Sequence, residues 1–166
     1  MESKKLSKIL FSFYFLALIW IILFKMQMPF SQFGIRRSIN LIPFAESVVV
    51  DGKIYVKEIV DNILIFVPFG VFACMIGREK NWLQRLAPVF FTSLAVEVLQ
   101  YILGIGATDI TDLLGNTAGG LLGMGVFAVF RKLCREKVYL ILNVVLLVGA
   151  VGAGMLLGML VLVNAS

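Results

Sequence analysis

Long apolar runs constrain the fold of this chain more than any other feature of its sequence. An α-helix rises about 1.5 Å per residue, so about 20 residues cross the hydrocarbon layer of a bilayer. Five apolar runs cover residues 6–24, 63–76, 86–103, 113–130 and 138–163. Four of them come near the length of a span, and the second reaches it when the preceding turn, which holds Asp61 and Asn62, is included. We therefore expect an all-α integral membrane protein with about five transmembrane helices, organised as one domain over residues 1–166.

The composition narrows the chemistry that such a domain can perform. Hydrophobic residues make up 60% of the chain, and histidine is absent. Without histidine, Ser-His-Asp and Cys-His catalysis and histidine-ligated metals are excluded. Cys74 and Cys134 are too few for a disulfide framework or a thiolate metal site. Carboxylates remain available for acid–base chemistry or for binding a hard cation, so catalysis is narrowed but not excluded.

The positions of the basic residues predict an orientation in the membrane. Lysines and arginines precede the first run and fill the second–third and fourth–fifth connections, whereas residues 104–108 contain none. The positive-inside rule then places the N-terminus in the cytoplasm and the C-terminus outside. The long segment 25–57 departs in part from this rule, since it would lie outside and yet carries Arg36 and Arg37. The net charge of +5 favours anionic lipid over nucleic acid as a partner, because no soluble module is predicted.

The first run has the basic start and apolar core of a cleaved signal peptide. The run is longer than the apolar core of a typical signal peptide, however, and residues 22–26 offer no small-residue cleavage site. We expect an uncleaved transmembrane anchor.

The only long connection, residues 25–57, is unusually apolar. Within it, residues 40–44 (Asn40, Leu41, Ile42, Pro43, Phe44) are too few to span a bilayer and include a helix breaker. We interpret this part as an interfacial or re-entrant segment packed on the outer helix ends. An amphipathic loop lying on the lipid headgroups is the alternative.

Small residues recur at every fourth position of the last two runs. Gly115, Gly119 and Gly123 share one face of the fourth run, and the same spacing joins Ala150, Gly154 and Gly158 in the fifth. Such faces allow a neighbouring helix to approach closely, either within one chain or between copies in a homo-oligomer. Pro68 falls inside the second run and predicts a kink there.

Polar residues gather at the predicted outer ends of the second, third and fourth runs. Glu97 and Gln100 share a helix face, and so do the three residues at positions 109, 112 and 116. The full set of candidate ligand-binding residues is Arg37, Asn40, Asp61, Asn62, Glu97, Gln100, Asp109, Asp112 and Asn116. The orientation set by basic residues thus brings separate acidic stretches to one depth.

Each of these residues also has a purely structural interpretation. Either Thr108 or Asp109 is suited to cap the fourth helix, and Asp61 to mark the water boundary. Glu97 lies inside an apolar run, where an ionised carboxylate costs at least a few kcal/mol unless it is paired, protonated or hydrated. Its structural alternative is a hydrogen bond to a nearby amide. Crowded carboxylates repel, so Arg36 and Arg37, a bound cation or a protonated Glu97 is expected to offset them.

Four motifs in order resemble the VanZ-like family of bacterial membrane proteins. They are Arg37 with Asn40-Leu41-Ile42-Pro43-Phe44, Asp61-Asn62 with Phe66-Val67-Pro68-Phe69-Gly70, Glu97 with Gln100, and Asp109, Asp112, Asn116 and Gly119. Many members carry an arginine in the place of Gly106, so a role that depends on it does not carry over. The resemblance implies low-level resistance to teicoplanin-type lipoglycopeptides, antibiotics whose acyl tail would enter the outer leaflet.

Three functions follow as hypotheses. The first is a non-catalytic site, without a cofactor, that binds the antibiotic or a polyprenyl-linked cell-wall precursor at the outer leaflet. The second is a membrane-embedded hydrolase or transferase that uses Glu97 and Asp112 with a divalent cation. The third is a small carrier, which the gathering of polar residues at one face disfavours.

Overall fold

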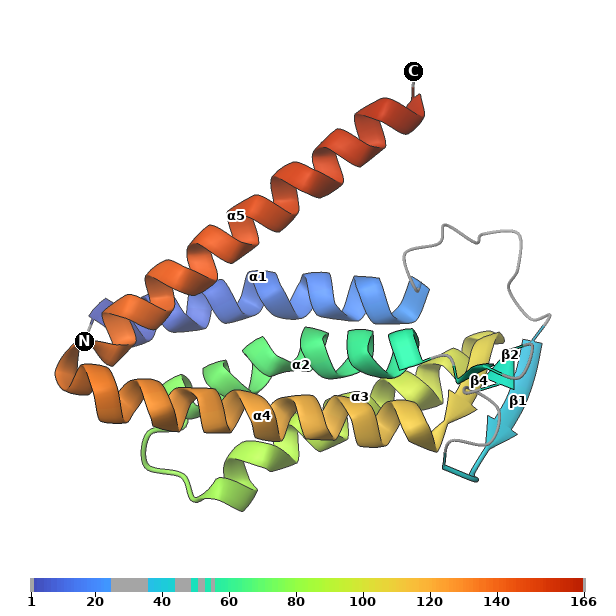
Figure 1. The fold of residues 1–166 in the computed structure, drawn as a ribbon, viewed down its shortest axis with the longest axis horizontal. Helices are drawn as coiled ribbons and strands as arrows, with labels where there is room; N and C mark the ends of the chain where they lie inside the picture. The colour runs from blue at the N-terminus through green and yellow to red at the C-terminus, as the bar shows by residue number, and fades with distance from the viewer. Residues whose placement is uncertain (1, 25–35, 44–48, 51–52, 55, 166) are drawn as a thin grey trace.

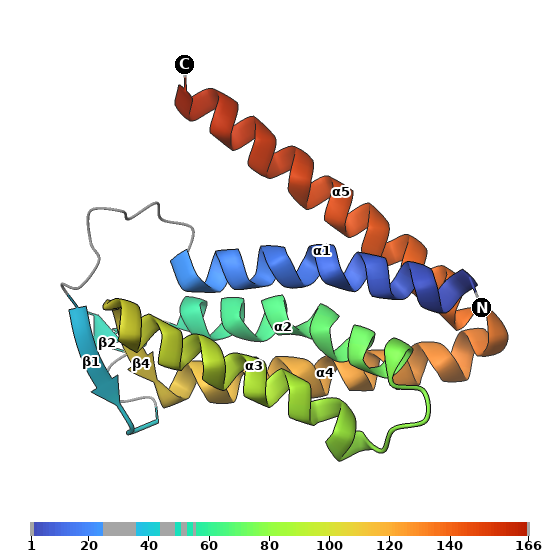
Figure 2. The same ribbon diagram turned by 180° about the vertical axis from the view of Figure 1, so that it is seen from behind.

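Five long helices make up most of the computed structural model, which describes residues 2–24, 36–43, 49–50, 53–54 and 56–165. The helices are α1 (Glu2–Phe24), α2 (Val56–Ile76), α3 (Trp82–Leu103), α4 (Ile110–Cys134) and α5 (Val138–Ala165). A 3-10 turn, η1 (Arg135–Lys137), joins α4 to α5. Helices α1 to α4 lie side by side, and the later part of α5 runs away from them (Figures 1 and 2). The predicted all-α membrane class is confirmed.

The predicted number of about five spans is too high. Among the described residues, four stretches are long and apolar enough to cross a membrane. They are Lys4–Leu23, Lys57–Ile76, Trp82–Leu103 and Ile110–Gly152. The last two apolar runs are joined in one stretch of 43 residues because η1 joins α4 directly to α5 without a loop, although the charged residues of positions 131–137 lie between the runs. The chain turns within this stretch at Arg135, which has a positive φ of 48°.

Short strands lie at the end of the bundle away from the N-terminus (Figure 1). Strand β1 (Arg36–Asn40) pairs in parallel with β4 (Ile105–Asp109), and β2 (Val49–Val50) pairs antiparallel with β3 (Lys53–Ile54). The sequence predicted only a turn at 104–108. Parallel partners are joined by long crossovers, here α2 and α3, so neither local sequence reveals the pair. Part of the interfacial segment is thus anchored by pairing, while Leu41 and Ile42 remain exposed and Phe44 lies outside the described residues.

Glycines bring α2 and α4 close together. A Cβ built on Gly119 would lie 2.1 Å from the Ile63 carbonyl oxygen, and one on Gly123 would lie 2.0 Å from that of Val67. On α2, a Cβ on Gly70 would likewise meet the backbone of α4. The small-residue face of α4 therefore packs within the chain, as one of the two alternatives predicted.

The contacts of helix α5 that the described side chains make lie near its start. The Ser7 hydroxyl of α1 donates to Asn143 Oδ1 over 3.0 Å, and both side chains are buried. Tyr139 packs on Phe127 of α4, with ring centroids 6.0 Å apart. Farther along, a Cβ on Gly154 would meet nothing within 4 Å. For α5, packing between copies stays a prediction.

The predicted kink at Pro68 also stays a prediction. Pro68 lies inside α2, which continues on both sides of it. In the turn before the proline, the Tyr14 hydroxyl of α1 donates to the Ile65 carbonyl oxygen over 2.5 Å. Tyr14 thus links α1 to the backbone of α2 beside the proline.

Candidate functional site

Two facing stripes of buried polar side chains join α3 to the start of α4. On α3 the stripe follows the i, i+4, i+7 spacing of one helix face, and on α4 it begins at the residue before the helix. We call these residues the polar seam: Ser93, Glu97 and Gln100 from α3, with Asp109, Asp112 and Asn116 from α4 and its N-cap. All six are buried, and none is more than 8% exposed. Polar side chains so deeply buried need partners within the fold or in a ligand.

The seam lies at one end of the bundle. Helix α3 ends there at Leu103, and α4 begins there at Ile110. The same end holds the start of α2 and the paired strands, opposite to the chain N-terminus (Figure 1). Polar stretches that the sequence separates therefore meet at one level of the bundle.

Asp109 caps α4 and contacts Glu97. The chain leaves α3 through Gly104, whose φ of 63° suits glycine, and runs along β4 to Asp109. There the carboxylate Oδ1 of Asp109 accepts from the Thr111 N–H over 2.7 Å, as a helix N-cap does. The Asp109 N–H donates to Glu97 Oε2 over 3.0 Å. The predicted cap at Asp109 is present, and Glu97 Oε2 accepts a backbone N–H from the residue that makes the cap.

Asn62 joins α2 to the seam. Its Nδ2 donates to Asp112 Oδ1 over 2.6 Å. Its neighbour Asp61 faces away and is exposed, and its Oδ2 accepts from Lys57 Nζ over 3.0 Å. Adjacent residues of a helix point about 100° apart, so only one of the two can face α4. The structure brings Asn62 to the seam and leaves Asp61 outside it.

Asn40 reaches the seam through the strand pairing. Parallel register sets it opposite Asp109, and its Nδ2 donates to Asp109 Oδ2 over 3.3 Å. Its own Oδ1 accepts from the Ile42 N–H over 3.1 Å. The backbone of Arg37 lies opposite Gly106. The side chains of Arg36 and Arg37 lie outside the described residues, so their pairing with the carboxylates stays a prediction.

Two buried amide oxygens in the seam accept no hydrogen bond from the described residues. Gln100 donates from Nε2 to the Ile22 carbonyl oxygen of α1 over 3.0 Å, yet its Oε1 has no partner. Asn116 donates from Nδ2 to Ser93 Oγ over 2.9 Å, yet its Oδ1 has none. Leaving such a buried acceptor unpaired costs about 1–3 kcal/mol.

Sequence reasoning missed Ser93, and it gave Thr108 only as an alternative cap of the fourth helix. Ser93 precedes Glu97 by one turn on the same face, which is the signal that could have found it. The Thr108 hydroxyl donates to the Glu97 carbonyl oxygen over 3.0 Å and thereby ties β4 to the end of α3. That contact depends on the strand and had no sequence signal.

The metal-binding alternative concerns the carboxylates of the seam. No group of three or more Asp, Glu or Cys side chains that could hold a metal ion is found among the described residues. A divalent cation held by Glu97 and Asp112 would therefore find no third carboxylate or thiolate ligand in the part of the chain that the structure describes.

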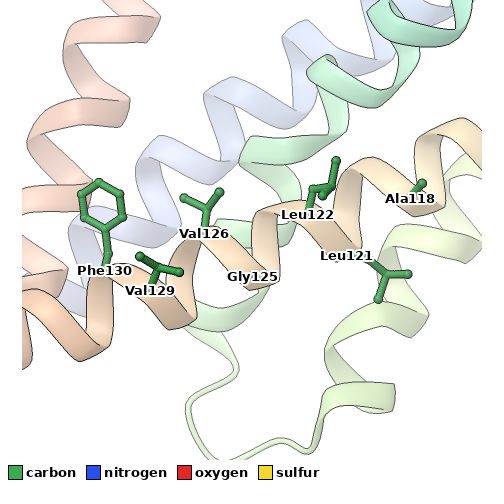
Figure 3. A pocket seen from close by; sticks show the side chains of 7 residues that line it. All are labelled: Ala118, Leu121, Leu122, Gly125, Val126, Val129 and Phe130. Atoms are coloured by element: carbon green, nitrogen blue, oxygen red, sulfur yellow. The ribbon is translucent and has the colours of Figure 1, made fainter.

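An apolar groove of about 720 Å³ runs along α4 but lies apart from the seam. Figure 3 shows its side chains projecting from α4 between Ala118 and Phe130. These positions alternate with the buried residues that face α2 and α3, such as Gly119 and Gly123. The groove therefore opens on the other face of the helix from Asp112 and Asn116.

Comparison with known proteins relates the chain to one family. Residues 11–131 match the family model described as VanZ/LLP1. The chain is 39% identical over 137 residues to Protein VanZ of Enterococcus faecium, and the alignment covers 81% of each chain. No solved structure matches the chain. The matched range contains the whole polar seam together with Asn40 and Asn62.

Proposed function

Because the chain belongs to the VanZ/LLP1 family, we propose that it confers low-level resistance to teicoplanin-type lipoglycopeptides. It does so from the bacterial plasma membrane, by binding the antibiotic or a polyprenyl-linked cell-wall precursor at the polar seam. The family relationship supports the resistance, and the long apolar helices of the chain suit a multi-pass membrane protein. The mode of action is our inference from the seam.

The observation that carries the proposal is the pair of buried acceptors, Gln100 Oε1 and Asn116 Oδ1, that the described residues leave without donors. A fold without a ligand gains stability when such atoms are paired or replaced by apolar groups. Polar groups of this kind are common where a protein orients a ligand. The seam also lies at a helix end, where a ligand with an acyl tail in one leaflet can present its polar part.

Conservative changes in the seam test the binding function. Glu97→Gln and Asp112→Asn keep the size of the side chain and an oxygen that can accept the bonds from the Asp109 N–H and Asn62 Nδ2, but remove a charge. In a teicoplanin-susceptible Gram-positive host, we expect both variants to lower the minimum inhibitory concentration toward that of cells without the protein. Membrane levels are matched by immunoblot.

Asp61→Asn is the matched control. It removes a carboxylate at the same end of the bundle, but from an exposed position outside the seam. We expect it to keep wild-type resistance. Full resistance in both seam variants at wild-type protein levels would contradict a functional seam. Turnover of lipid substrates by purified protein, lost in the same variants, would instead favour an enzyme.

The proposed orientation places the seam toward the outer leaflet. Cysteine labelling tests it in a chain with Cys74→Ala and Cys134→Ala. A cysteine at Ile42, near the seam, is expected to react with an impermeant maleimide in intact cells. A cysteine at Glu79, in the exposed turn between α2 and α3, is expected to react only after permeabilisation. The reverse pattern would place the seam at the cytoplasmic face.

A further inference from the structure

The apolar groove along α4 has about the length of one bilayer leaflet. Its lining runs from Ala118 to Phe130, and none of the lining residues carries a polar side chain (Figure 3). At about 1.5 Å per residue the lining extends about 18 Å along the helix, close to half of a hydrocarbon layer of about 30 Å. The groove therefore suits an acyl chain that enters from one face of the membrane.

Exposed basic residues follow the groove at one end. Lys132 comes seven residues after Gly125, a spacing that keeps both on one face of the helix. Arg135 and Lys137 come next, in the turn to α5, and all three basic residues are exposed. We call these three residues the basic end of the groove. In the other direction, the same face continues with Leu114, which is exposed and apolar, so the groove has one charged end.

The side chains of the basic end make no hydrogen bond or ion pair with any residue that the structure describes. Other arginines at this end of the bundle are already engaged. Arg85 donates to the Gly77 carbonyl oxygen over 2.9 Å, and Cζ of Arg78 lies 3.6 Å from the centre of the Tyr139 ring. Residues 131–137 hold four basic residues and one acidic residue. Unengaged positive charge beside an apolar groove suits an anionic headgroup.

We propose that the groove and its basic end bind one anionic phospholipid, with an acyl chain along α4 and the phosphate at Lys132. A lysine ammonium offers three donors on a flexible stem, which suits a phosphate oxygen. A zwitterionic lipid carries its own cation, so it gains less from this end. The polar seam meets α4 near Ile110, whereas the basic end follows the other end of the helix. The lipid site therefore does not depend on the proposed function of the seam.

Lipids with matched acyl chains test the headgroup preference of the purified protein in detergent. Dioleoyl phosphatidylglycerol is anionic, dioleoyl phosphatidylcholine is zwitterionic, and inorganic phosphate carries charge without a chain. We expect phosphatidylglycerol to raise Tm and, by native mass spectrometry, to bind at least about fivefold more tightly than phosphatidylcholine. Phosphate alone is expected to leave Tm unchanged. Equal binding of the two lipids, or an equal rise in Tm with phosphate alone, would overturn the proposal.

Two neighbouring charges separate a defined site from general attraction to a basic surface. Lys132→Gln removes a charge from the face of the groove. Arg131→Gln is the matched control, because Arg131 follows the buried Phe127 by one turn on the face that packs into the bundle. We expect Lys132→Gln to weaken phosphatidylglycerol binding about fivefold and Arg131→Gln to weaken it by less than about twofold. Equal losses would overturn the proposal.

Filling the groove tests the place of the acyl chain. Gly125→Leu puts a side chain into the middle of the groove, and the fold accepts it because a Cβ there would meet nothing within 4 Å. Gly152→Leu on α5 is the matched control, since its Cβ would also meet nothing within 4 Å. We expect Gly125→Leu to weaken phosphatidylglycerol binding severalfold and Gly152→Leu to leave it unchanged. Unaltered binding to Gly125→Leu would overturn the proposal.

A second copy of the chain is the competing occupant of the groove. In that case the purified protein would be a dimer without added lipid, and Gly125→Leu would dissociate it. That result would overturn the lipid site. A monomer that retains one phosphatidylglycerol molecule, as counted by native mass spectrometry, would support it.

Discussion

Asn62 on α2 and Asp112 on α4 are joined by a hydrogen bond of 2.6 Å between Nδ2 and Oδ1. The bond crosses the closest helix pair of the fold, in which Gly119 and Gly123 let the backbones of α2 and α4 approach. Close backbones bring short side chains within reach of each other, so the packing of these two helices holds Asn62 against the polar seam.

Removing Asn62 is expected to destabilise the fold more than removing an exposed ion pair. Asn62→Ala leaves Asp112, which is buried, without this donor, at a cost of about 1–3 kcal/mol in the free energy of unfolding. Lys57→Ala breaks the exposed pair with Asp61 and is expected to cost less than about 1 kcal/mol. Unfolding in detergent micelles measures both. Equal losses would contradict the role given to the buried bond.

Alanine at Gly119 is expected to separate α2 from α4. The new Cβ would overlap the Ile63 carbonyl oxygen, and relieving the overlap shifts the backbone, with an expected loss of about 1–3 kcal/mol. Gly125→Ala on the same helix is the control, because its Cβ would meet nothing within 4 Å. It is expected to be neutral or stabilising by up to about 1 kcal/mol. Thermal unfolding of the two variants provides the comparison, and a Gly119→Ala protein as stable as Gly125→Ala would refute the close approach.

The capping role of Asp109 can be separated from its charge. Asp109→Ala removes the acceptor of the Thr111 N–H and is expected to cost about 0.5–2 kcal/mol. Asp109→Asn keeps a good cap but sets its NH₂ group against Asn40 Nδ2, so it is expected to cost less than Asp109→Ala, which loses both bonds. Measuring stability and teicoplanin susceptibility together tells the roles apart. A stable Asp109→Asn protein that loses resistance would show that the charge acts beyond capping.

The parallel strand pair predicts a specific cross-link. In a chain with Cys74→Ala and Cys134→Ala, cysteines at Ile39 and Thr108 lie opposite each other and project to the same side. Cysteines at Ser38 and Thr108 are shifted by one residue and project to opposite sides. We expect mild oxidation to link the first pair faster, as followed by proteolysis and gel mobility. Preferential linking of the shifted pair would show a different register.

The fold class and the level of the site follow from local features of the sequence. Hydrophobic length is a property of each run, so the membrane helices were predictable without knowing their neighbours. Because short connections make successive helices antiparallel, the stretches holding Asn62, Glu97 and Asp112 had to meet at one end. The count of spans differed, since η1 joins α4 to α5 without a loop and makes one continuous stretch of the last two runs.

The sequence alone thus determined a bundle of apolar helices with its polar residues gathered at one end. Tertiary structure decided which of those residues face one another. It turned Asn62 inward and Asp61 outward, gave Glu97 the Asp109 N–H, and paired β1 with β4 across two intervening helices. These outcomes depend on the rotation of each helix against its neighbours and on contacts between distant segments, which local periodicity does not encode.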